Sequence, residues 1–289
     1  ISDRTLTAKD KKLIRKAFEV ALDAHSDQRR KSGEAYIFHP IAVAKIVASE
    51  IGLDANSIAA ALLHDVVEDC PRYTIDDIQQ LFGETVAKIV NGLTKISNIK
   101  KDMNVSMQAE NFRRMLLTLH DDIRVIIIKI ADRLHNMQTI HSMREDKQLK
   151  IASETLYIYA PLAHKIGLYN IKTELEDLAL KYTEPEIYNG ILNKLEESKE
   201  EQDFYINDIN KVLTKALNKE KLKYEIKGRP KSIFSIRRKI RDQGVSFEEV
   251  YDKFAVRIIY KSDIKGEKFL AWKIYSIVTD HFRPNPIRL

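Results

Sequence analysis

The stretch His-Asp-Val-Val-Glu-Asp at residues 64–69 ends an apolar run, residues 57–63, that has the composition of a buried helix. If the helix continues, each residue advances by about 100°, so that His64 shares a face with Glu68, and Asp65 with Asp69. Carboxyl groups crowded at the end of an apolar helix raise one another's pKa and are costly to desolvate unless a cation compensates them. Two interpretations stay open from this segment alone. One is a divalent-metal site with further acids beside it, and the other is an acidic, solvated helix end that contains a histidine by chance.

The composition of the whole chain predicts a mainly α-helical protein with a substantial core. Of its 289 residues, 44% are hydrophobic and only 9 are Gly and 7 are Pro, which favours helices in one large domain or two modest ones. The net charge of +6 suits an anionic ligand. The single Cys excludes an internal disulfide and a Cys-based zinc site. The sequence contains no recognisable signal peptide or transmembrane run, so we expect a cytoplasmic protein with no membrane partner.

Two further segments place chemically active side chains at a helix end or in an apolar setting. Pro40 suits the first position of a helix over residues 41–50, closed by Gly52, and His39 then lies at its start. Residues 122–140 are apolar nearly all round and predict a core helix. Within that helix Asp132 is disfavoured unless it is paired or bound to a metal.

The other interpretation of Asp132 is an ion pair within its own helix, with Lys129 or Arg133 as the partner. The basic pair Arg30 and Lys31, just before His39, has two interpretations as well. It could hold an anionic substrate, or it could be an ordinary exposed basic turn.

The remaining patterns divide the chain into a helical part and the beginning of an α/β unit. Further helices are predicted over residues 75–82, 84–97, 106–119 and 147–182, with an irregular loop at 98–105, a junction at Pro161 and a long charged helix from Pro185 to about residue 218. The pattern then changes, and strands are predicted over 222–227 and 254–260, with helices over 232–243 and 267–282. We therefore expect a helical domain over residues 1–184, a helical linker over 185–220 and an incomplete α/β domain over 221–289.

The candidate ligands lie on three different predicted helices: His39, the pair His64 and Asp65, and Asp132. Two imidazoles and two carboxylates form a mixed nitrogen and oxygen site that leaves positions for water around an octahedral metal. Manganese or ferrous iron fits such a site better than structural zinc. Glu68 and Asp69 would remain beside the metal-bound water, where a general base or a water-orienting group is needed.

The order of these residues resembles the metal-ligand pattern of the HD-domain phosphohydrolase superfamily. Three longer strings are more specific and resemble the RelA/SpoT homologues, the long bifunctional enzymes of the stringent response. They are Arg-Lys-Ser-Gly-Glu-x-Tyr-x-x-His-Pro at residues 30–40, the stretch at 64–69, and Ala-Asp-Arg-Leu-His-Asn-Met at 131–137. This resemblance extends over essentially the whole chain.

The resemblance implies an all-helical, manganese-dependent hydrolase that removes the 3′-pyrophosphate from ppGpp and pppGpp, giving GDP or GTP and pyrophosphate. By position, it implies that the metal ligands are His39, His64, Asp65 and Asp132. It implies that Glu68 and Asp69 activate or orient the attacking water, and that the nucleotide contacts are Arg30, Lys31 and Asn136, with Thr139 as a neighbour.

The string at residues 228–239 resembles the start of the family's alarmone synthetase domain, which has a nucleotidyltransferase-like α/β fold. The resemblance implies that ATP is contacted by Arg229, Lys231, Ser235 and Lys239, and that Mg²⁺ is bound by Asp252. Because Lys231, Ser235 and Lys239 are spaced by four, a helix would align them along one face, a surface that suits a triphosphate.

The family's synthetase transfers pyrophosphate from ATP to GTP and also needs a Tyr that stacks on GTP and a catalytic Glu. Both are expected after Leu289, so we expect no synthetase activity from this chain. Contact with the ribosome would require regions further along the parent protein.

Two other functions compete with the alarmone hydrolase. The first is an HD phosphohydrolase for another nucleotide, such as a deoxynucleoside triphosphate or a cyclic dinucleotide, and a substrate panel separates it. The second is a non-catalytic nucleotide or RNA-binding regulator, because residues 227–241 contain seven basic residues and no acidic one. That regulator would bind RNA with a steep salt dependence and would be indifferent to replacement of Asp132.

Overall fold

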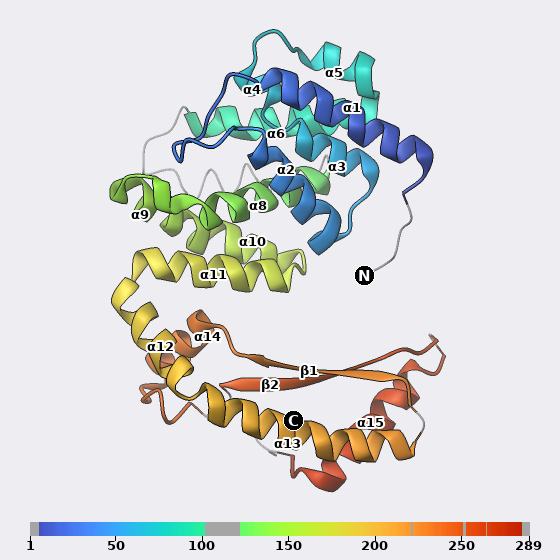
Figure 1. Ribbon diagram of the computed structural model, residues 1–289, viewed down its shortest axis with the longest axis vertical. Helices are drawn as coiled ribbons and strands as arrows, with labels where there is room; N and C mark the ends of the chain where they lie inside the picture. Colours follow the sequence, from blue (N-terminus) through green and yellow to red (C-terminus); the bar gives the residue numbers. More distant parts are fainter. Residues whose placement is uncertain (1–5, 102–121, 221, 251–252, 264, 285–289) are drawn as a thin grey trace. The chain divides into compact units, whose positions relative to one another are not determined.

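The computed structural model describes residues 6–101, 122–220, 222–250, 253–263 and 265–284, with the side chains of residues 96–101, 229 and 230 left aside. The chain forms two compact units, Ile1–Thr183 and Glu184–Leu289 (Figure 1). The predicted helix at residues 106–119 lies outside the described residues. The predicted loop at 98–105 is described only to residue 101, which is still helical.

The described part of the first unit is helical throughout, as the composition predicts. Its α-helices are α1 (Ala8–Ala24), α2 (Phe38–Lys45), α3 (Ala55–Leu62), α4 (Val66–Asp69), α5 (Ile75–Phe82), α6 (Glu84–Lys101), α8 (Ile123–Gln138), α9 (Glu145–Glu154), α10 (Ala160–Lys165) and α11 (Tyr169–Thr183). The π-helical turns η1 (Ile46–Ile51) and η4 (Thr155–Tyr159) continue α2 and α9, and a 3₁₀ turn, η3 (Ile140–Ser142), follows α8. Gly52, with φ of 80°, closes η1 as predicted.

Helices α3 and α8 form the centre of this unit. All residues of α3 except Asn56 are buried, and α3 packs against α1, α2 and α6. Helix α8 packs against α2, α6 and α11. Where α6 passes α8, a Cβ added at Gly92 would lie 2.7 Å from Cγ2 of Val125, so the two helices approach more closely there than a larger side chain allows.

Carboxylate caps fix the starts of both central helices. The side chain of Asp54 accepts a hydrogen bond from the backbone N–H of Ser57 at the start of α3, and Asp122 accepts one from Arg124 at the start of α8. The Arg124 guanidinium lies 2.7 Å from Asp122 Oδ2 and 3.6 Å from Asp54 Oδ2, so one cation links the two caps.

The prediction of one helix through residues 57–69 is wrong. Helix α3 ends at Leu62, and α4 begins only at Val66. Leu63 has φ of −99° and ψ of 5°, and its carbonyl accepts the N–H of Val66, which closes a tight turn. The sequence pattern gave no sign of this turn, because buried apolar residues continue from α3 through the turn into α4. His64 and Asp65 therefore project from a turn between two helices and not along one helix face.

The second unit places helices against a two-stranded antiparallel sheet. Its elements are α12 (Pro185–Glu197), α13 (Lys199–Lys219), β1 (Tyr224–Pro230), α14 (Ile233–Gln243), β2 (Phe254–Tyr260) and α15 (Glu267–His281). Strand β1 pairs with β2 from Tyr224 opposite Tyr260 to Pro230 opposite Phe254. Figure 1 shows α13 and α15 on one side of this sheet, where Leu213, Leu217 and Ile274 are buried against its apolar face.

The single charged helix predicted from Pro185 is wrong, because it is interrupted at Ser198. The Ser198 hydroxyl donates to the Lys194 carbonyl at 2.8 Å and ends α12. Helix α13 then packs against α15 within the second compact unit. The functional division into a hydrolase domain, a linker and an incomplete synthetase domain stays a prediction.

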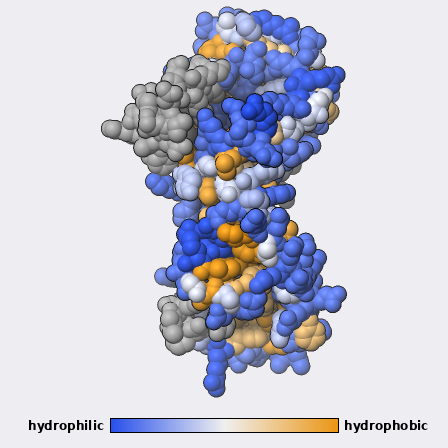
Figure 2. All heavy atoms as spheres, turned by 90° about the vertical axis from the view of Figure 1, so that its left-hand side faces the viewer, coloured by the Kyte–Doolittle hydropathy of each residue, from blue (hydrophilic) through white to orange (hydrophobic). Residues whose placement is uncertain are grey.

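The face of the described chain that Figure 2 shows is mainly polar. In the view of Figure 2, hydrophilic residues cover most of the first unit, and a patch of hydrophobic residues is visible on the second. Among the described residues, no helix is both long and apolar enough to cross a membrane.

Candidate metal centre

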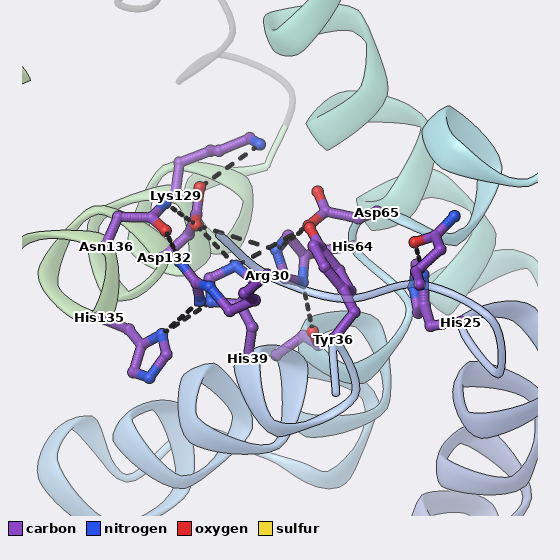
Figure 3. A network of polar contacts seen from close by, with 12 residues as sticks. His25, Arg30, Tyr36, His39, His64, Asp65, Lys129, Asp132, His135 and Asn136 are labelled. Carbon is purple, nitrogen blue, oxygen red and sulfur yellow. Dashed lines mark hydrogen bonds and ion pairs between the residues drawn. The ribbon is translucent and has the colours of Figure 1, made fainter. Parts of the chain in front are cut away.

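Four side chains predicted to bind a metal lie close together inside the first unit (Figure 3). His39 lies in the first turn of α2, His64 and Asp65 lie in the turn between α3 and α4, and Asp132 lies on α8. His64 Nε2 is 2.8 Å from Asp65 Oδ2, and His39 Nε2 is 3.2 Å from Asp132 Oδ1 and 3.8 Å from Asp65 Oδ2. One ligand atom each from His39, His64 and Asp65 lies within 4.8 Å of the others. The turn at Leu63 is therefore what directs both members of the pair to one place.

The donor atoms fit a divalent cation. His64 is 1% exposed, and its Nδ1 lies 2.8 Å from the Ala61 carbonyl, so Nδ1 carries the ring proton and donates a hydrogen bond to that oxygen. Its buried Nε2 faces Asp65 Oδ2 at 2.8 Å and Asp132 Oδ1 at 3.9 Å. An imidazole lone pair cannot face carboxylate oxygens unless a proton or a cation lies between them. A shared cation would satisfy all of these atoms at once.

The charges of the site are those that a cation requires. Burial opposes ionisation of Asp65, but the neighbouring His64 and Lys129 hold its pKa well below the ordinary value. Burial also opposes ionisation of Asp132, and a hydrogen bond from His39 together with Lys129 holds its pKa well below the ordinary value. Both carboxylates are therefore charged at neutral pH.

The two histidines differ in their affinity for a proton. Burial lowers the pKa of His39, despite the opposing influence of Asp132. Burial acts in the same direction on His64, but Asp65 and Asp132 outweigh it and raise the pKa of that ring. A metal must therefore displace a proton more often from His64 than from His39.

The ion pair proposed as the other interpretation of Asp132 is also present. Lys129 Nζ lies 3.7 Å from Asp132 Oδ2, while Asp132 Oδ1 faces the two imidazoles. Arg133 instead pairs with Glu154 at 3.1 Å and lies over the Tyr159 ring at 4.2 Å. Because the lysine and the histidines approach different oxygens, pairing with Lys129 and binding of a metal are compatible.

Three contacts of the candidate ligands were not predicted. The Tyr36 hydroxyl donates to Asp65 Oδ2 at 2.6 Å, and His39 Nδ1 lies 2.7 Å from His135 Nδ1. Asn136, predicted as a nucleotide contact, donates from Nδ2 to Asp132 Oδ1 at 2.7 Å. The sequence signal for the last of these was available, because Asn136 lies four residues after Asp132 on one face of a helix.

The protonation of these supporting groups is also shifted. Burial, reinforced by the adjacent Asp65, raises the pKa of Tyr36, so its hydroxyl keeps its proton at neutral pH. Burial, together with His39 and Arg30, lowers the pKa of His135 to about 4. His135 is therefore neutral at physiological pH.

Of the basic pair before α2, Arg30 borders the site and Lys31 is exposed. Arg30 donates to Asn136 Oδ1 at 2.9 Å, and its other terminal nitrogen lies 3.2 Å from His135 Nδ1. Thr139, the other predicted nucleotide neighbour, donates its hydroxyl to the His135 carbonyl at 2.9 Å. Arg30, His135 and Asn136 thus connect the loop before α2 with the helix that carries Asp132.

The predicted acid pair lies on α4, directly after the His64 and Asp65 turn. Glu68 is half-buried and Asp69 is exposed. Glu68 contributes to the raised pKa of Lys129, and Asp69 contributes to that of Tyr36. Both acids therefore act electrostatically on residues that surround the candidate ligands.

The predicted triphosphate surface of the second unit differs from the expected one. Helix α14 begins at Ile233 with Ser232 as its cap, so Lys231 precedes the helix and its N–H bonds to the Lys253 carbonyl. Only Ser235 and Lys239 are aligned by the helix, and the Ser235 hydroxyl accepts from that of Ser232 at 2.8 Å. The Arg229 side chain and Asp252 lie outside the described residues.

Comparison with known proteins agrees with this site. A family model described as "HD domain" matches residues 17–169, which include His39, His64, Asp65 and Asp132. The chain belongs to the HD-domain family.

Individual relatives show which members of this family the chain resembles. A probable guanosine-3′,5′-bis(diphosphate) 3′-pyrophosphohydrolase of Synechocystis sp. is 45% identical over 96% of this chain and 36% of its own length. A GTP pyrophosphokinase of Myxococcus xanthus is 44% identical over 86% of this chain and 33% of its own length. A guanosine-3′,5′-bis(diphosphate) 3′-pyrophosphohydrolase of Aquifex aeolicus is 44% identical over 94% of this chain and 38% of its own length. The predicted resemblance to the RelA/SpoT homologues is confirmed, and the chain spans little more than a third of the length of these relatives.

Proposed function

We propose that the helical unit is a manganese-dependent hydrolase that converts ppGpp and pppGpp to GDP and GTP by releasing the 3′-pyrophosphate. The observation that carries the proposal is the meeting of His39, His64, Asp65 and Asp132, with the buried His64 Nε2 directed at two charged carboxylates. The names of the relatives support the choice of substrate, since two of the three are guanosine-3′,5′-bis(diphosphate) 3′-pyrophosphohydrolases.

The four side chains would hold the metal through His39 Nε2, His64 Nε2 and one oxygen each of Asp65 and Asp132. When bound, manganese supplies positive charge to a phosphate oxygen and makes a nearby water more acidic. The second ring nitrogen of each histidine is already engaged, by His135 and by the Ala61 carbonyl. These contacts keep both rings oriented toward the metal position.

Glu68 and Asp69 are the candidates for accepting the proton of the attacking water and for orienting it. They follow the ligand pair directly on α4, yet neither is among the four candidate ligands. Glu68 is half-buried and Asp69 is exposed, so solvent water can reach both acids. Water attack on the phosphorus attached to the 3′-oxygen forms one new P–O bond and breaks the bond to the ribose oxygen, which leaves pyrophosphate and the nucleoside 5′-phosphates.

Arg30, Lys31, Asn136 and Thr139 would contact the nucleotide. Arg30 has five N–H donors and uses some of them for His135 and Asn136. Its charge is therefore placed at the edge of the metal position, where it would attract the anionic substrate. Lys31 extends this charge into solvent.

For the second unit we propose the beginning of a synthetase domain, with Arg229, Lys231, Ser235 and Lys239 toward ATP and Asp252 toward Mg²⁺. In the parent protein, this domain would transfer pyrophosphate from ATP to GTP. The support is the basic helix α14 after a strand and the GTP pyrophosphokinase among the relatives. The test is synthesis of ppGpp from ATP and GTP, and its detection with this chain would contradict our expectation of none.

The experiment for the hydrolase is incubation of the chain with ppGpp and Mn²⁺, with and without a chelator, followed by anion-exchange separation of the products. We expect GDP and pyrophosphate, loss of activity with chelator, and loss of activity in His64→Ala. His281→Ala is the matched control, because His281 is an exposed histidine of the second unit, and it should retain full activity.

Intact ppGpp in the presence of folded, manganese-loaded protein would contradict the proposal. A substrate panel with deoxynucleoside triphosphates and cyclic dinucleotides belongs to the same experiment. If the chain hydrolyses one of these nucleotides faster than ppGpp, that nucleotide would replace the alarmone as the proposed substrate.

A further inference from the structure

Tyr36 is a residue of the 30–40 string to which neither the sequence analysis nor the proposed function assigns a role. Its hydroxyl donates to Asp65 Oδ2 at 2.6 Å (Figure 3). The same oxygen lies 2.8 Å from His64 Nε2 and 3.8 Å from His39 Nε2. Asp65 Oδ2 is therefore the carboxylate oxygen closest to the place where the imidazoles meet, and Tyr36 occupies one of its lone pairs.

The ring of Tyr36 is held on two sides. It lies against His25 with ring centroids 4.7 Å apart and meets His39 edge-on at 5.7 Å. His25 is 2% exposed, and its Nδ1 lies 2.7 Å from Gln28 Oε1. The backbone N–H of Tyr36 donates to the Gln28 carbonyl at 3.0 Å. The hydroxyl is thus placed by its ring contacts and by its main chain together.

The position of the hydroxyl matters because Asp65 lies in the turn between α3 and α4 and not within a helix. Asp65 is the N-cap of α4, but its carboxylate accepts no capping hydrogen bond from a backbone N–H. A neutral donor on Oδ2 restricts rotation of the carboxylate and adds no positive charge that would repel a cation.

We propose that Tyr36 is a positioning residue, which orients Asp65 Oδ2 for the divalent metal. The inference rests on the metal site of the proposed function. It goes beyond that function in assigning a separate group, outside the ligands, the acid pair and the nucleotide contacts. Outer-sphere donors of this kind raise metal affinity by about 10-fold to 100-fold.

The test compares Tyr36→Phe with Tyr73→Phe. Tyr73 is the matched control because its hydroxyl also donates to a carboxylate, Asp23 Oδ2 at 2.7 Å, but at the surface. Both substitutions remove one hydroxyl and retain the ring. The first readout is the dissociation constant for Mn²⁺, measured by the electron paramagnetic resonance signal of free Mn²⁺. The second is ppGpp hydrolysis as a function of Mn²⁺ concentration.

We expect Tyr36→Phe to bind Mn²⁺ about tenfold more weakly than the wild type and Tyr73→Phe to bind it equally well. High Mn²⁺ should restore most of kcat in Tyr36→Phe, because the ligands themselves are intact. The unfolding temperature of the metal-free protein should fall no further in Tyr36→Phe than in Tyr73→Phe, which separates positioning from general stability.

Equal Mn²⁺ affinity in the wild type and Tyr36→Phe overturns the positioning role. If that result accompanies normal binding and hydrolysis by the wild type, only this inference fails. If the folded wild type binds no Mn²⁺, the proposed function and the inference fail together.

Discussion

In the first unit, the candidate ligands come from three separate segments and meet in a buried cluster, whereas in the second unit the candidate nucleotide contacts follow one another along a single strand and helix. Buried charges must find partners, so the position of each group in the first unit depends on the others. Ser235 and Lys239, in contrast, lie one turn apart on the single helix α14. Residues that are distant in sequence but converge in space are therefore a stronger indication of a functional site than residues that follow one another along one segment.

Of the substitutions that compare the two units, replacement of Asp132 is expected to have the largest effect on metal binding and hydrolysis. Asp132→Asn removes the charge that faces both imidazoles, so Mn²⁺ affinity and ppGpp hydrolysis should each fall by more than about a hundredfold, since even outer-sphere partners contribute up to that much. Ser235→Ala is the counterpart in the second unit and should leave hydrolysis unchanged. The measurements are Mn²⁺ titration and product release, and normal hydrolysis by Asp132→Asn would contradict the proposed site.

The ion pairs of the two units offer a second test. Arg133 is 7% exposed, pairs with Glu154 and lies over Tyr159, so Arg133→Met should lower the free energy of unfolding by about 3 kcal/mol by leaving a carboxylate unpaired. Lys194→Met, which removes an exposed pair with Glu248 in the second unit, should cause no measurable change. Urea denaturation gives both values, and a larger effect at Lys194 would reverse the comparison.

The pH dependence of metal binding sharpens the comparison further. Because Asp65 and Asp132 outweigh burial and raise the pKa of His64 above 6.5, the metal-free site holds a proton there below that raised pKa. Metal must displace this proton, so Mn²⁺ affinity should rise by up to about tenfold per pH unit as the pH rises toward the pKa of His64, then level off. Burial lowers the pKa of His39, so protonation of that ring should contribute less to the pH dependence than protonation of His64.

The measurement is Mn²⁺ titration between pH 5.5 and pH 8. The residues of the second unit that are predicted to contact ATP include no histidine, so ATP binding by that unit should vary little over the same pH range. Mn²⁺ affinity independent of pH would contradict His64 as a ligand.

The smallest effect is expected at the cap of the central helices. Arg124 links Asp122 and Asp54 near the surface, so Arg124→Gln should cost less than about 1 kcal/mol of unfolding free energy, and less still in high salt. Arg241→Gln, which removes the exposed pair with Asp242 in the second unit, should leave stability unchanged at any salt concentration. Thermal unfolding at two salt concentrations checks both.

Much of the fold follows from local patterns. The helix over residues 75–82, its end at Gly83 and the strand over 254–260 are confirmed at the predicted residues. These elements depend on capping, glycine conformation and alternation, which act within a few residues. The turn at Leu63 and the break at Ser198 could not be predicted in this way. At Leu63 the apolar run continues without a Gly or Pro, and at Ser198 the charged residues continue on both sides of the break.

The identity of the site residues could be predicted from the sequence, but the contacts between them could be predicted less well. The burial of Asp132 in an apolar helix and the crowding of acids at residues 64–69 indicated a cation, and the resemblance to a family assembled the set. The contacts from Tyr36 to Asp65 and from His135 to His39 depend on side-chain directions across 29 and 96 residues of sequence. Nothing in periodicity or composition reports such directions.

The close passage of α6 and α8 at Gly92 also bears on how this enzyme family could be tuned. An alanine there would press on Val125, two turns before Asp132 on the same helix. We expect substitutions at this contact to move Asp132 relative to the other candidate ligands, which would offer protein engineering a way to adjust metal binding through helix packing.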